Sequence, residues 1–116
     1  MLSANRVLER VRELCLSLPE TREVTSWGHP NFRAGKKTFV ALEQIKGRPS
    51  IAFRLEGIDV DLLLRRTQFF VTPYGRGQWV SVWADGPLNW RQVADLVERS
   101  YRLVAIKRMI AALEKK

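Results

Sequence analysis

The stretch Phe69–Trp83, FFVTPYGRGQWVSVW, decides the fold of this chain. Two runs of aromatic and β-branched residues, typical of β-strands, flank a link that holds one proline and two glycines. Because proline lacks a backbone N–H and glycine permits positive φ, the link is expected to turn. The sequence therefore predicts a β-hairpin with strands at Phe69–Thr72 and Gln78–Trp83.

The second strand of this hairpin carries two different apolar faces. Successive side chains of a strand point to opposite sides, so Val80 and Val82 share one face and Trp79 and Trp83 share the other. We expect the valines to face the core. Tryptophan is well buried on average, which favours packing for both indoles. Their positions predict that Trp79 is buried beside the turn and that Trp83, at the strand end, is partly exposed.

The remaining chain predicts helices around an antiparallel meander. Apolar residues at helical spacing indicate a first helix over Ala4–Leu18 and a short second one within Gly57–Arg66. The strands between them are expected at Thr38–Leu42 and Ser50–Leu55, joined by the polar link Glu43–Pro49. A hairpin loop at 34–37 precedes the first of these strands.

Capping residues indicate where the helices begin. Asp59 is the candidate N-cap of the short helix, and Asn89, followed by Gln92, is the candidate N-cap of the third. The apolar stripe of the third helix changes face further on, which predicts a break or bend near Ser100–Ala105.

Length and composition describe one globular domain. The chain has 116 residues, 46% of them hydrophobic and 28% charged, which favours a single domain over residues 1–116 without a membrane-spanning run. The start of the chain lacks the pattern of a secretory signal, and Cys15 is the single cysteine. We therefore expect a cytoplasmic protein in which Cys15 is a small buried hydrophobe and not a nucleophile.

The net charge is the unusual bulk property. Twenty Lys and Arg residues against twelve Asp and Glu give +8, with a sequence pI near 10.4. Such a surface attracts polyanions, although the same excess could serve solubility alone. The basic loops concentrate this charge, and two meander turns at one end of the sheet would form a basic rim with the hairpin tip. The candidate nucleic-acid contacts are Arg33, Lys36, Lys37, Arg76, Lys107 and Arg108.

No catalytic, cofactor or metal motif is recognisable. His29 is the single histidine, and without a second one, and with Cys15 on a different face, a metal site lacks ligands. A turn histidine bonded to backbone is favoured over a catalytic one. The aromatic residues of the two turns nevertheless permit a small-molecule pocket or interaction surface, formed by Trp27, His29, Tyr74, Trp79 and Trp83.

Several local strings resemble those of the MmcQ/YjbR family, small bacterial proteins. They are CLSLPE at 15–20, WGHPNFR at 27–33, KTFV at 37–40, FF at 69–70, TPYG at 72–75, GQWV at 77–80 and SYRLVA at 100–105 followed by KR at 107–108. The resemblance implies an α+β fold in which N- and C-terminal helices pack on one side of an antiparallel β-sheet, similar to frataxin-like and secretion-chaperone-like arrangements. Ile106 stands where members usually have proline, which favours a continuous helix.

The resemblance also implies a double-winged DNA-binding role without catalytic residues or cofactors. The leading hypothesis is therefore a non-enzymatic DNA-binding protein of low specificity, with hairpin loops as wings that contact phosphates. The alternative is a protein-interaction or chaperone-like module that binds a peptide or dimerises through Trp79, Trp83 and the sheet surface. A monomer or weak dimer is expected in either case.

Overall fold

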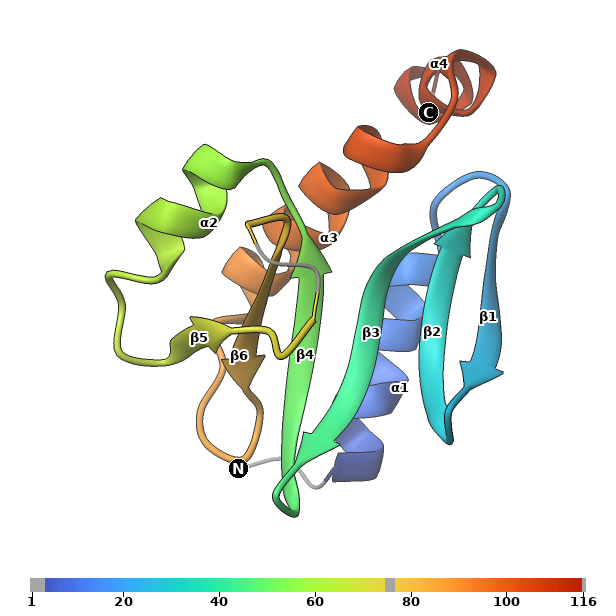
Figure 1. The fold of residues 1–116 in the computed structure, drawn as a ribbon. Helices are drawn as coiled ribbons and strands as arrows, with labels where there is room; N and C mark the ends of the chain where they lie inside the picture. The colour runs from blue at the N-terminus through green and yellow to red at the C-terminus, as the bar shows by residue number, and fades with distance from the viewer. Residues whose placement is uncertain (1–3, 75–76, 116) are drawn as a thin grey trace.

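The computed structural model describes residues 4–74 and 77–115 (Figure 1). Arg76, the expected hairpin tip, lies outside these residues. The elements in chain order are α1 (Ala4–Leu16), β1 (Thr21–Ser26), β2 (His29–Ala34), β3 (Lys37–Ile45), β4 (Arg48–Arg54), α2 (Gly57–Leu63), β5 (Phe69–Val71), β6 (Trp79–Trp83), α3 (Trp90–Val104) and α4 (Lys107–Glu114).

The strands form one antiparallel sheet in the order β1-β2-β3-β4-β6-β5. Helices α1 and α3 pack on one face of it and lie behind the sheet in Figure 1, while no described helix covers the face toward the reader. The expected α+β architecture, with the N- and C-terminal helices on one side, is confirmed. Among the described residues, no helix is both long and apolar enough to cross a membrane.

The core lies between this sheet and the two helices. In the middle strands, Phe53 is opposite Val80 and Ile51 is opposite Val82, and all four side chains are buried. A β-bulge in β3 turns both Phe39 and Val40 toward the helices, where they are fully buried. The large apolar side chains of the sheet therefore lie on the face toward α1 and α3, so the opposite face can remain without a layer of helices.

Helix α3 is fixed in this core by an aromatic contact and a long-range hydrogen bond. The ring of Tyr101 meets Phe39 edge-on at 5.8 Å between centroids. Its hydroxyl donates to the carbonyl oxygen of Pro19 at 2.8 Å, which satisfies the polar end of a fully buried side chain. Cys15 is fully buried as expected, and burial raises the pKa of its thiol, so the thiolate is disfavoured.

The hairpin predicted at Phe69–Trp83 is present, with β5 paired to β6. Its link is longer than expected because the strands end at Val71 and begin again at Trp79. Trp79 is 9% exposed on the face away from the helices, and Trp83 is partly exposed, as the alternation predicts. The ring of Trp83 stacks on Phe70 at 4.1 Å, and the guanidinium of Arg48 lies 3.8 Å from its centroid.

The prediction of a polar link at Glu43–Pro49 is wrong. Strand β3 continues to Ile45 and pairs with β4 through a two-residue turn in which Lys46 and Gly47 have φ of 53° and 79°. The turn after β3 and the turn after β2 consequently lie at opposite ends of the sheet. The basic rim that required both meander turns at one end therefore does not form.

The helix ends differ from expectation in two places. Glu56, and not Asp59, is the N-cap of α2, and Asp59 instead lies in its first turn, 3.5 Å from Arg99. Asn89 caps α3 as predicted, since its side chain accepts from the backbone N–H of Gln92. The predicted break near Ser100–Ala105 is confirmed, because α3 ends at Val104. The continuous helix that Ile106 favoured does not form, because Ile106 has an extended backbone, with φ −83° and ψ 167°, and precedes α4.

An ion pair ties α1 to the edge strand. The guanidinium of Arg12 donates to both carboxylate oxygens of Glu23, at 2.6 and 3.0 Å. This hydrogen bonding lowers the pKa of Glu23 below its usual range. A carboxyl with a depressed folded-state pKa stabilises the fold above the unfolded value of about 4.3 and loses that contribution as pH falls through the folded pKa.

We expect Glu23→Gln to reduce the free energy of unfolding at pH 7 by less than about 1 kcal/mol, because water screens a partly exposed pair. The difference from wild type should shrink below pH 4 and vanish near pH 2, measured by denaturant titration at each pH. Glu13→Gln, on the exposed face of α1, is the control without this dependence. A Glu23 difference that persists unchanged at pH 2 would contradict the assignment.

The two indoles of β6 should differ in their effect on stability. Trp79→Ala removes a buried side chain and should cost about 3–5 kcal/mol in the free energy of unfolding. Trp83→Ala removes a stacking and a cation–π contact at a partly wet site and should cost roughly 1–2 kcal/mol. Chemical denaturation of both variants checks this, and equal losses would refute the assignment of Trp83 to the surface.

Candidate functional site

The face of the sheet that the helices leave open has a floor of small side chains. Ala41, Ala52 and Ser81 lie opposite one another on β3, β4 and β6, and all three are buried. Part of their cover comes from the segment that follows β5. In Figure 1 this segment crosses in front of β6 toward β4. Its residue Thr72 is buried, and the Thr72 and Ser81 hydroxyls are hydrogen-bonded at 2.8 Å.

A groove of about 520 Å³ lies on this face beside that segment. It is lined by three parts of the chain that are distant in sequence: the β1–β2 hairpin, strand β3, and the β5–β6 connection with the first residue of β6. The lining residues are Ser26, Trp27, His29, Asn31, Thr38, Glu43, Gln44, Ile45, Pro73, Tyr74 and Trp79. The groove is within the usual size range of ligand pockets, roughly 300–1,000 Å³.

Four of the five residues expected in a pocket or interaction surface line this groove. Trp27, His29, Tyr74 and Trp79 come together there, while Trp83 does not contribute to it. Sequence reasoning missed Glu43 and Asn31. Glu43 falls in the predicted polar link Glu43–Pro49. The position of Asn31 opposite Ala41 follows only from the pairing of β2 with β3.

Tyr74 and Glu43 join the β5–β6 connection to β3 across the groove. The Tyr74 hydroxyl donates to Glu43 Oε2 at 2.7 Å, and its ring meets Trp79 edge-on at 5.8 Å. Partial burial, together with the bond to the carboxylate, raises the pKa of Tyr74, so the phenol stays protonated and remains a donor. The other carboxylate oxygen, Glu43 Oε1, is buried without a hydrogen-bond partner in the protein.

Trp27 stands at the rim of the groove in an unusual conformation. It has φ 54° and is followed by Gly28 at φ 80°, in the two-residue turn between Ser26 and His29. Two positive φ values are typical of a type I′ hairpin turn, where Asn-Gly is preferred and a bulky residue is rare. The Trp27 side chain is 95% exposed, so it gains almost nothing from packing.

Three arginines gather at the other end of the groove. Arg22 and Arg33 lie directly opposite each other on β1 and β2, and Arg54 lies opposite Trp79 on β4. Like charges directly opposite in a sheet are destabilising. Within residues 4–74 and 77–115, none of the three forms an ion pair. The Nε atoms of Arg33 and Arg54 are buried without a hydrogen-bond partner in the protein.

The residues expected to contact nucleic acid are only partly brought together. Arg33, Lys36 and Lys37 lie at the same end of the sheet, in and beside the β2–β3 turn. That turn packs near α4, since a Cβ on Gly35 would be 3.9 Å from Met109 Cε. Helix α4 carries Lys107, exposed, and Arg108, whose guanidinium is engaged by both carboxylate oxygens of Glu20.

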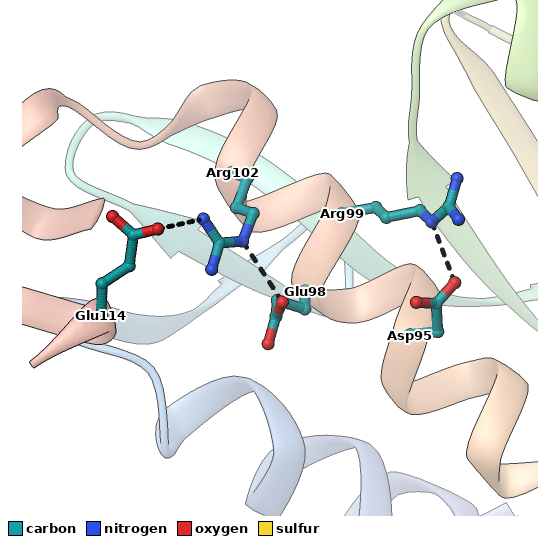
Figure 2. Close-up of polar contacts among 5 residues, drawn as sticks. All are labelled: Asp95, Glu98, Arg99, Arg102 and Glu114. Atoms are coloured by element: carbon teal, nitrogen blue, oxygen red, sulfur yellow. Dashed lines mark hydrogen bonds and ion pairs between the residues drawn. The ribbon is translucent and has the colours of Figure 1, made fainter. Parts of the chain in front are cut away.

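Two arginines of α3 are paired with acids. Figure 2 shows Arg99 bound to Asp95, and Arg102 bound to Glu98 and Glu114, along the exposed side of α3. Among the described residues, no three His, Cys, Asp or Glu side chains are grouped so that they could hold a metal ion. Described cations without an ion pair lie on both sides of the sheet. They are Arg22, Arg33 and Arg54 on the open face, Lys36 and Lys37 beside it, and Arg10, Arg91 and Lys107 among those of the helices.

Similar folds are found in three solved structures. A crystal structure from Deinococcus radiodurans, of a DUF419 domain, has 17% identity and a TM-score of 0.74, covering 92% of this chain and 87% of its own. A crystal structure from Pseudomonas syringae has 16% identity and a TM-score of 0.72, covering 88% and 98%. A solution NMR structure from Pseudomonas syringae has 15% identity and a TM-score of 0.68, covering 91% and 95%.

At these identities the likeness shows the fold alone. No curated protein sequence matches the chain. The model of the YjbR family does match it, over residues 16–103, from the end of α1 almost to the end of α3. This range includes the whole sheet and the groove. The sheet order, the helical layer and this match together show that the chain belongs to the YjbR family.

Proposed function

We propose that this protein is a non-enzymatic nucleic-acid-binding protein that contacts phosphates with the open face of its sheet. One observation carries the proposal: the two guanidinium Nε atoms of Arg33 and Arg54 are buried on that face without an acceptor in the protein. A buried donor without a partner costs about 1–3 kcal/mol, and more when it is charged. An anion beside these partly exposed guanidinium groups offsets the cost of their unpaired charge, and it reaches the buried Nε atoms once the side chains shift.

The distribution of charge supports a polyanion as the partner. Glu23 and Glu43 are the acids within the described strands, and Glu23 faces α1. The open face therefore has one strand carboxylate, Glu43, and three arginines, Arg22, Arg33 and Arg54. Two further cations, Lys36 and Lys37, lie at the same end of the sheet as Arg33. Arginine suits phosphate because its planar fork can donate two parallel hydrogen bonds.

This surface differs from the wings expected from the sequence. The contacts proposed here are on the sheet and beside the β2–β3 turn, because the β3–β4 turn lies at the far end. The peptide-binding alternative depended on Trp83 as well as Trp79. Trp83 is stacked between Phe70 and Arg48, which leaves less free aromatic surface for a peptide.

A salt titration tests the proposal. Five phosphate contacts predict a log–log slope of the binding constant against salt of about −4.5 for duplex DNA and about −3.5 for a single strand. We expect the double variant Arg33→Gln, Arg54→Gln to weaken binding about tenfold or more and to reduce the magnitude of the slope by about two units. The measurement is fluorescence anisotropy of labelled oligonucleotides at two or more salt concentrations.

The matched control is the double variant Arg99→Gln, Arg102→Gln, which removes the same charge from the helical layer (Figure 2). Its binding should stay within about threefold of wild type, because those guanidinium groups are already paired. Both double variants should remain folded by thermal denaturation. Absence of binding at low salt, or equal weakening by the two double variants, would overturn the proposal.

A further inference from the structure

A groove lined by hydrogen-bonding groups and aromatic rings continues from the arginines along β2. From Arg33 to His29 is four residues of strand, or about 13 Å. Thr38, opposite Arg33, and Trp79, opposite Arg54, both line the groove, so it is continuous with the arginine end. A ligand whose phosphate lies on the arginines can therefore extend toward Trp27.

The conformation of Trp27 is the second observation. The fold would be at least as stable with asparagine at this position, because Asn-Gly is the preferred sequence of the turn. An indole that is 95% exposed in a left-handed backbone conformation offers the fold neither packing nor turn preference. It does offer a broad π-face beside the groove, on which every nucleobase can stack.

The unpaired carboxylate oxygen is the third observation. Glu43 Oε1 is buried without a donor in the protein, and Oε2 accepts from Tyr74, so a ligand that donates to this carboxylate reaches it by displacing the Tyr74 hydroxyl or by shifting the side chains over Oε1. A carboxylate accepts from the exocyclic amino group of a base such as cytosine. In a duplex the faces of the bases are stacked on their neighbours, so a base can stack on Trp27 only when it leaves the helix. One N–H of the cytosine amino group stays open in the major groove, so the stacking contact is the one that favours a single strand.

We propose that the groove receives an unpaired nucleobase, stacked on Trp27 and donating to Glu43, so that the preferred ligand is single-stranded nucleic acid. This inference rests on the proposed function for its phosphate contacts. It adds the base contacts, which phosphate binding alone would not require.

The test compares Trp27→Asn and Trp27→Phe with wild type. Binding of a labelled single-stranded oligo-dC and of a duplex of equal length is measured by anisotropy at one salt concentration. Trp27→Asn should weaken binding to the single strand at least about fivefold, leave duplex binding unchanged and leave the melting temperature equal or higher. Trp27→Phe keeps a ring and should retain most of the affinity.

The contact with Glu43 has its own measurement. Wild type should bind oligo-dC more tightly than oligo-dT, because thymine lacks an exocyclic amino donor. Glu43→Gln should reduce this preference without reducing the salt slope. An oligo-C of RNA run beside the DNA probe distinguishes whether the 2′-hydroxyl contributes.

The possible results separate this inference from the proposed function. If Trp27→Asn binds the single strand as wild type does while Arg33→Gln, Arg54→Gln weakens it, the inference is wrong and phosphate binding stands. If duplex is bound more tightly than single strand, the inference is also wrong. If no nucleic acid binds at low salt, both fail, and a peptide becomes the occupant to test on this face.

Discussion

The antiparallel pairing of β4 with β6 is the constraint on which the rest of this structure depends. It places Ile51 and Phe53 opposite Val82 and Val80, and this apolar block is what α3 covers. Because side chains alternate, the same register sends Ala52, Arg54 and Trp79 to the other face. A slip of one residue would exchange the two faces and bury an arginine under the helix. The core and the candidate site are therefore set by one register.

Most of the fold could be predicted because its signals are local. Pro73 and the nearby glycines indicate the hairpin, and the alternation of side chains separates Val80 and Val82 from the tryptophans. Asn89 indicates the start of α3 because it is a preferred N-cap residue. The extension of β3 could not be predicted. Glu43 and Gln44 resemble loop residues. Glu43 lies on the face of β3 that no described helix covers, where a polar side chain fits a strand, and Gln44 is exposed near the strand end.

The candidate site was only half predictable, for a different reason. The aromatic and histidine residues of the groove could be suspected individually by type, but their convergence depends on pairing between distant strands. The register that places Arg22 opposite Arg33 depends on the β1–β2 turn, whose sequence, Trp27-Gly28, lacks the asparagine or aspartate that usually marks it. Gly28 and Pro30 do indicate a turn in this segment, but the two-residue hairpin that sets the register is visible only in the structure.

The distribution of the net charge of +8 supports the proposed anion binding over simple solubility. Solubility needs net charge anywhere on the surface, and paired or evenly mixed charges serve it. In this protein the acids lie mainly on the helical side, where Glu20, Glu23 and Asp95 engage arginines. The open face keeps opposed cations next to an uncovered groove, which weakens the sheet locally. The proposed function accounts for this local cost, because an anionic ligand would relieve the repulsion when it binds.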